Sequence, residues 1–88
     1  MFEFDLAKSE ANRAKHGIDF VEAQGLWEDE LRIVAPAMSV GENRWIMVGR
    51  IGDKLWSAIF TLRDEGIRII SVRRSRPKEI ARYEAQED

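Results

Sequence analysis

The sequence contains no cysteine and a single histidine, His16. Without cysteine the chain can form neither a disulfide bond nor a thiolate zinc site, and one imidazole would leave a metal site to be built mainly from carboxylates. The acidic residues show no spacing that predicts such a site. We therefore expect neither a metal ion nor another cofactor.

Long apolar runs and linker-like segments are also absent. No run approaches the about 20 apolar residues that cross a bilayer, and the first residues lack the basic-then-apolar layout of a signal peptide. With 88 residues, two prolines, six glycines and no repeat, the chain predicts one domain over residues 1–88. We expect a cytoplasmic protein without a membrane partner.

The charges are unevenly distributed, although the net charge is only −2. Residues 1–43 hold four Lys and Arg against nine Asp and Glu, whereas residues 44–83 hold ten against four. A basic second half is typical of a surface that meets an anion. The acidic overall balance argues weakly against nucleic acid as the ligand.

The first helix is predicted over residues 6–16. Asp5 is a suitable N-cap because its carboxylate can accept hydrogen bonds from the first turn, and Gly17 can end the helix in the left-handed conformation. Small apolar residues recur at helical spacing and predict the side that packs on the sheet: Ala7, Ala11 and Ala14. A second stripe has the same spacing: Lys8, Asn12 and Lys15.

The rest of the chain predicts a second short helix, several strands and a last helix. Asp19 can cap the second helix, and Pro77 suits the first turn of the last one. The strands are predicted over residues 31–38, 44–51, 55–62 and 66–74. Short turns between the last three indicate an antiparallel meander. The predicted fold class is therefore α+β, with two N-terminal helices, an antiparallel β-meander sheet and a C-terminal helix.

The last hairpin determines where several arginines lie. If its loop has three residues, Arg63 faces Ile67 and Ser57 faces Arg73. Arg73 and Arg74 then point to opposite faces of the sheet, roughly 17 Å from Arg63 at the rise of a strand. This spacing fits successive phosphates of a polymer better than a single phosphate.

Several short motifs follow one another along most of the chain. They are Phe2-Glu3-Phe4-Asp5, Lys8, Asn12, Lys15-His16-Gly17, Phe20 with Glu22 and Ala23, Val48-Gly49-Arg50, the segment 67–74, and Glu79 with Tyr83 and Glu84. In this order they resemble the BrnT-type toxins of type II toxin–antitoxin systems. Phe4 stands where that family often has tryptophan.

The resemblance implies a fold similar to the RelE class of small ribonucleases. It also implies an endoribonuclease that cuts RNA and arrests translation. The implied partner is a BrnA-type antitoxin, a DNA-binding protein that folds over the toxin and represses its own operon. Operator DNA would be reached indirectly, through the antitoxin, in a higher-order toxin–antitoxin complex.

Metal-independent RNA cleavage needs a base for the 2′-OH, cations for the phosphorane, and an acid for the leaving 5′-oxygen. His16 could be base or acid, because histidine exchanges protons near neutral pH; alternatively, its ring caps the first helix. Arg73 and Arg74 can bind phosphate through two hydrogen bonds. One of them is expected at the scissile phosphate, and the other in a salt bridge to Glu79 or in contact with the antitoxin. Lys8 is the fourth catalytic candidate.

The RNA-binding candidates are Lys15, Arg63, Arg68 and Tyr83. Tyr83 could stack on a base, although an aromatic residue on a terminal helix is more often part of the core. Two alternatives to a nuclease stay open at this point. The chain could bind RNA or a partner without cutting, or it could be an inactive toxin that acts only as a co-repressor.

Overall fold

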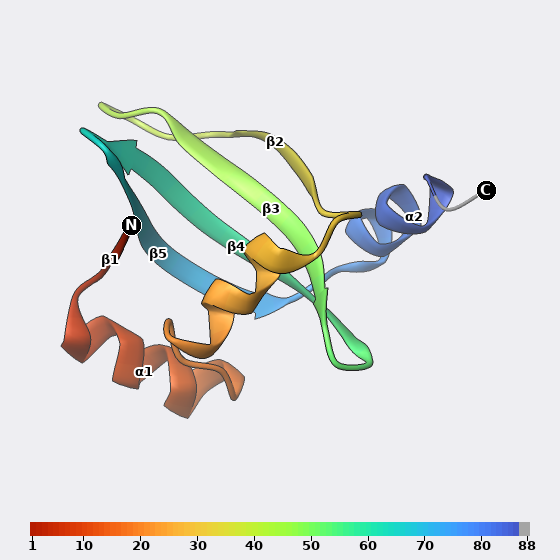
Figure 1. The fold of residues 1–88 in the computed structure, drawn as a ribbon, viewed down its shortest axis with the longest axis horizontal. Coiled ribbons are helices and arrows are strands. Elements are labelled where there is room, and N and C mark those ends of the chain that lie inside the picture. Colours follow the sequence, from red (N-terminus) through yellow and green to blue (C-terminus); the bar gives the residue numbers. More distant parts are fainter. Residues whose placement is uncertain (87–88) are drawn as a thin grey trace.

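The computed structural model describes residues 1–86 as a five-stranded sheet with helices packed against it (Figure 1). The elements in chain order are β1 (Phe2–Glu3), α1 (Leu6–His16), the 3₁₀ helix η1 (Glu22–Glu28), β2 (Ile33–Ala37), β3 (Arg44–Ile51), β4 (Lys54–Arg63), β5 (Gly66–Arg74) and α2 (Pro77–Ala85). The α+β class is confirmed. None of the helices in residues 1–86 is long and apolar enough to cross a membrane.

The sheet is mixed, so the predicted antiparallel meander accounts for four of its five strands. Its strand order is β1-β5-β4-β3-β2, and β2 to β5 form the expected antiparallel meander. The short strand β1 lies parallel to β5, with Phe2 beside Ile67, and Ile67 N donates to Met1 O at 2.8 Å. The parallel pair forms because β1 supplies hydrogen-bond partners to backbone groups on the edge of β5 that would otherwise stay unpaired.

Helix α1 has the predicted ends. Asp5 accepts a hydrogen bond from Lys8 N at 3.1 Å, and Gly17 ends the helix with φ 84°. The predicted alanine stripe, however, is exposed, and the buried side chains of α1 are Ser9 and Asn12. The helix therefore packs through polar contacts rather than through small apolar residues.

These polar contacts fix α1 to two distant parts of the chain. Asn12 Nδ2 donates to Ile18 O at 2.8 Å and to Val72 O at 2.9 Å, while Asn12 Oδ1 accepts from Val72 N at 3.2 Å. Ser9 Oγ accepts from Phe20 N at 2.9 Å. A buried side chain in either position must find partners, and here the partners are backbone groups of β5 and of the segment after α1.

The second predicted helix is a 3₁₀ helix, so one α-helix rather than two precedes β2. Asp19 does act near its start, since Glu22 N donates to Asp19 Oδ1 at 2.8 Å. Ala23 and Leu26 are buried and turn η1 onto the sheet. Gly49 of β3 permits the close approach, because a Cβ there would lie 3.1 Å from Leu26 Cδ2.

The β4–β5 hairpin corrects the predicted register at one end only. Its turn has two residues, and Arg63 faces Gly66 instead of Ile67. Ser57 nevertheless faces Arg73, as predicted, because an irregularity near Ile59 shifts the pairing by one residue. An extra residue of this kind changes the register without breaking the ladder.

The two faces of the sheet are covered differently. The face under α1 and η1 holds the larger core cluster, which includes Phe20, Leu26, Trp56, Phe60 and Val72. On the opposite face α2 packs over one end only, where Val48, Leu55 and Tyr83 are buried together. Figure 1 shows α1 and η1 lying along one side of the sheet and α2 near its end. The two faces of the sheet therefore present two separate surfaces.

Candidate functional site

The end of β5 presents its two arginines to opposite faces, as predicted. Arg74 faces Trp56 across the β4–β5 pair, and its guanidinium carbon lies 5.5 Å from the centre of that ring. Arg73 turns to the other face, where its Nη1 and Nη2 atoms each lie 2.8 Å from a carboxylate oxygen of Glu79. Arg73 is therefore engaged by a carboxylate, whereas Arg74 is exposed.

Glu79 is the centre of a polar network that joins α2 to the sheet. Its Oε1 atom also accepts from Ser57 Oγ and from Arg76 N, each at 2.8 Å, and Ser57 Oγ lies 2.8 Å from Ser75 Oγ. The Arg73 guanidinium lowers the pKa of Glu79 to about 2, and Glu79 in turn raises the pKa of Arg73. The ionised pair is therefore stable at neutral pH and fixes the start of α2.

His16 lies at the C-terminal end of α1, on the same side of the sheet as Arg74. The helix runs in the direction of β5, because Phe2 pairs with Ile67 and Asn12 contacts Val72. The end of α1 therefore lies toward the end of β5 (Figure 1). His16 is half-buried there.

The two lysines of α1 lie at different distances from this end of the molecule. Lys15 is next to His16 in sequence and exposed. Lys8 is also exposed, but two turns of helix, roughly 12 Å, separate it from His16. His16 and Lys15 thus lie at the end of α1 that is directed toward the end of β5, and Lys8 lies further back along the helix.

Arg63 and Arg68 lie at the opposite end of the sheet. Arg63 forms an ion pair with Glu42 at 3.8 Å, and Arg68 forms one with Glu3 at 3.5 Å. Arg63 is seven positions along β4 from Trp56, the residue that faces Arg74, which is roughly 23 Å at the rise of a strand. These arginines could contact RNA only at a distance from the end of β5.

Tyr83 is a core residue, with 1% of its surface exposed. Its hydroxyl donates to Asp29 Oδ2 at 2.6 Å, and the Arg50 guanidinium lies 5.7 Å from the ring centre. Burial and the Asp29 contact raise the pKa of Tyr83. Burial opposes ionisation of Asp29, but hydrogen bonds from Tyr83 and from the N–H groups of Leu31 and Arg50 outweigh it and lower the pKa of Asp29. In this arrangement the ring has no exposed face for a base.

Sequence reasoning missed three of these contacts: the inward turn of Asn12, the Asp29–Tyr83 bond and the Ser57–Glu79 bond. The position of Glu79, two residues after Pro77, is typical of a carboxylate that binds the start of a helix and could have indicated its role. No local pattern indicates the other partners, because they are distant in the sequence.

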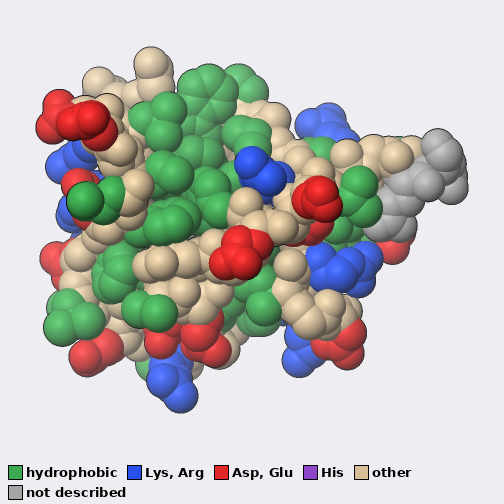
Figure 2. Space-filling model, viewed as in Figure 1, with side chains coloured by type: hydrophobic (Ala, Val, Ile, Leu, Met, Phe, Trp, Pro, Cys, Tyr) green, Lys and Arg blue, Asp and Glu red, His purple; other side chains and the backbone are tan. Residues whose placement is uncertain are grey.

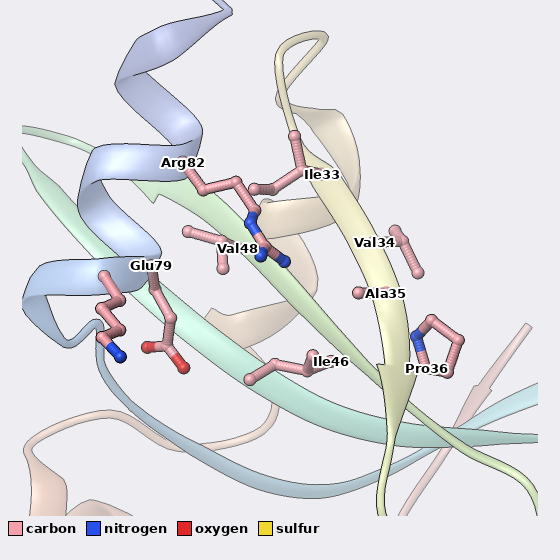
Figure 3. Close-up of a pocket in the computed structure, with 9 residues that line it drawn as sticks. Ile33, Val34, Ala35, Pro36, Ile46, Val48, Glu79 and Arg82 are labelled. Carbon is pink, nitrogen blue, oxygen red and sulfur yellow. The ribbon is translucent and has the colours of Figure 1, made fainter.

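The opposite face carries a groove between α2 and the strands β2 and β3 (Figure 3), with a volume of about 340 Å³. Ile46 and Val48 form its apolar floor, and Glu79 and Arg82 line it from α2. On the face that carries η1, Figure 2 shows hydrophobic side chains gathered over the strands, with charged side chains around them. Apolar surface is thus present on both sides of the sheet.

A comparison with known protein families identifies the family of this chain. Residues 4–79 match the family described as ribonuclease toxin, BrnT, of type II toxin–antitoxin system. The match covers most of the 88 residues, so the chain belongs to the BrnT family of ribonuclease toxins. A search of curated proteins found no matching relative. Membership implies an RNA substrate and an antitoxin protein as partner.

Proposed function

We propose that the protein is an endoribonuclease that cuts RNA without a metal ion, arrests translation in the cytoplasm, and is neutralised by a DNA-binding antitoxin of the BrnA type. Its membership in the BrnT family supports the ribonuclease class. The α+β class, with β2 to β5 in an antiparallel meander, is the part of the expected fold that the structure supports. The observation that carries the proposal is the placement of His16 and Arg74 at the same end of one face.

The proposed reaction is an internal transesterification. A base removes the proton of the 2′-OH, the 2′-oxygen attacks the adjacent phosphorus, and the bond to the 5′-oxygen breaks as that oxygen takes up a proton. The products are a 2′,3′-cyclic phosphate and a 5′-hydroxyl. His16 supplies one of the two proton transfers, and Arg74 stabilises the charge that develops on the phosphorane oxygens.

The remaining candidates take supporting positions in this proposal. Lys15 contributes positive charge next to His16, and Lys8 contacts the RNA backbone further along α1. Arg73 holds α2 through Glu79 rather than touching the scissile phosphate. Arg63 and Arg68 lie where they could contact a distant part of a long RNA.

Purified toxin incubated with total RNA in EDTA tests the proposal. His16→Gln keeps a polar side chain at the helix end, so a loss of cleavage of about 100-fold or more would be chemical rather than structural. Arg74→Ala should lose similar activity, and Arg74→Lys should recover part of it. Arg44→Ala is the control, because it removes a cation at the opposite end of the sheet.

Each alternative has its own outcome in the same assay. Retention of full cleavage by His16→Gln would remove His16 from the mechanism. RNA that is bound but not cut by the natural chain would favour a non-catalytic binding module. Neither binding nor cleavage would favour an inactive toxin that acts only as a co-repressor.

A further inference from the structure

The groove beside α2 is a surface that takes no part in the proposed cleavage reaction. Its floor is apolar, with Ile46 and Val48 from β3, and its outer wall includes Ile33 and Ala35 of the edge strand β2 (Figure 3). Ile33, Ala35 and Ile46 are only partly buried. A partner could therefore remove further apolar area from water here.

The inner wall of the groove is basic. Lys78 and Arg82 of α2 line it, and the side chain of Arg82 extends into it in Figure 3. Within residues 1–86 neither cation has an ion-pair partner. Glu79 also lines the groove, but its oxygens are engaged by Arg73 and by Ser57. The wall thus carries two cations whose charges no described residue balances.

Exposed apolar side chains also occur in and on either side of β2, the strand that borders the groove. Large hydrophobic residues of this segment are Leu31 at 43% exposure, Val34 at 48%, Met38 at 101% and Val40 at 99%. Exposed apolar side chains beside charged ones are typical of protein interaction sites. The partly buried apolar floor and the two cations of α2 make the groove the candidate docking surface.

We propose that this surface holds an acidic amphipathic segment of the antitoxin. The inference rests on the proposed function, because it takes the partner from the toxin–antitoxin assignment. The apolar side of the segment would cover Ile46 and Val48, and its carboxylates would pair with Lys78 and Arg82. Simple addition of a strand to the β2 edge is disfavoured, because Pro36 has no N–H to donate.

An RNA strand fits this groove less well than a protein segment. A phosphate backbone would find two cations but also an apolar floor that offers it no hydrogen bonds. The proposed cleavage site, with His16 and Arg74, lies on the other face of the sheet. Groove variants should therefore lose antitoxin binding while keeping RNA cleavage.

Calorimetric titration with the purified cognate antitoxin tests the assignment. Arg82→Glu reverses one groove charge on an exposed position, and it should weaken binding by about tenfold or more. Lys54→Glu is the matched control, since it makes the same charge change on an exposed residue outside the groove and should leave the affinity unchanged. Ile46→Ser, which removes part of the apolar floor, should also weaken binding.

RNA cleavage measured on the same variants separates this inference from the proposed function. Weaker antitoxin binding with unchanged cleavage supports the groove. Unchanged antitoxin affinity in both Arg82→Glu and Ile46→Ser contradicts the inference. A loss of RNA binding or of self-association in these variants, with antitoxin binding unchanged, also contradicts it. Absence of cleavage by the natural chain contradicts the proposed function, whatever the titration gives.

Discussion

Replacing Glu79 by glutamine should release α2 from the sheet more than any comparable surface change. Glutamine keeps an oxygen that can accept from Ser57 and from Arg76 N, but it removes the charge that Arg73 requires. Each side chain of the Arg73–Glu79 pair is 21% exposed, so Arg73 would be left largely desolvated without a counter-charge.

The pKa of Glu79 gives the size of the effect. Its fall from an ordinary value of 4.5 to about 2 corresponds to about 3.4 kcal/mol of stability, at about 1.36 kcal/mol per pKa unit. Screening by solvent at a partly exposed pair reduces this figure to about 2 kcal/mol. Because the folded-state pKa is depressed, the stabilisation is present above about pH 4.5 and is lost as the pH falls toward about 2.

Urea denaturation of the natural chain and of Glu79→Gln, followed by circular dichroism over this pH range, measures the difference. The gap in unfolding free energy should be about 2 kcal/mol at neutral pH and should narrow below about pH 4.5. Glu42→Gln is the control, because its ion pairs with Arg44 and Arg63 are more exposed and should contribute about 0.5 kcal/mol or less. A gap that is absent, or that does not change with pH, would refute the role of the charge.

Two further substitutions test the packing of η1 and α2. Tyr83→Phe removes the hydrogen-bond donor to Asp29, so the unfolding free energy should fall by about 1 kcal/mol. The pKa of Asp29, followed by NMR titration, should rise. An unchanged pKa of Asp29 would contradict the role of this hydrogen bond. Gly49→Ala places a Cβ 3.1 Å from Leu26 Cδ2 and should cost about 1–2 kcal/mol in urea denaturation. Gly25→Ala, where the nearest contact is an ordinary 3.7 Å, should be close to neutral; equal effects would show that close packing is not the cause.

Elements that depend on local chemistry were predictable from the sequence. The ends of α1 follow from Asp5 and Gly17, and the β4 and β5 strands follow from β-branched residues and turn signals. The parallel pairing of β1 with β5 was not predictable in this way, because it joins residues more than sixty positions apart. The close approach of Leu26 to Gly49 likewise joins residues that are distant in the sequence.

The candidate site likewise has a part that the local sequence predicts and a part that it does not. Alternation along a strand predicts that Arg73 and Arg74 point to opposite faces, and the structure confirms it. The pairing of Ser57 with Arg73 was predicted correctly through a loop length that was wrong by one residue. The irregularity near Ile59 compensates for the shorter turn, and no local signal in the sequence reports a bulge of this kind.

Asn12 is the residue whose role changes most between sequence and structure, and its substitution by aspartate tests that role. Asn12 is 8% exposed and donates to two carbonyl oxygens. In the Asn12→Asp variant a carboxylate would face both carbonyls, which should reduce the unfolding free energy by about 3 kcal/mol at neutral pH.

The pH dependence of this loss of unfolding free energy separates electrostatic repulsion by the carboxylate from a poor steric fit of the new side chain. Burial and the two carbonyls should raise the pKa of the introduced carboxyl, and protonation restores one O–H donor. The difference between the natural chain and Asn12→Asp should therefore narrow as the pH falls from about 7 toward about 4. Ala11→Asp makes the same charge change on the exposed side of α1 and should stay within about 0.5 kcal/mol. A constant difference would show that the side chain does not face the carbonyls, and α1 would then need another anchor to place His16 beside the end of β5.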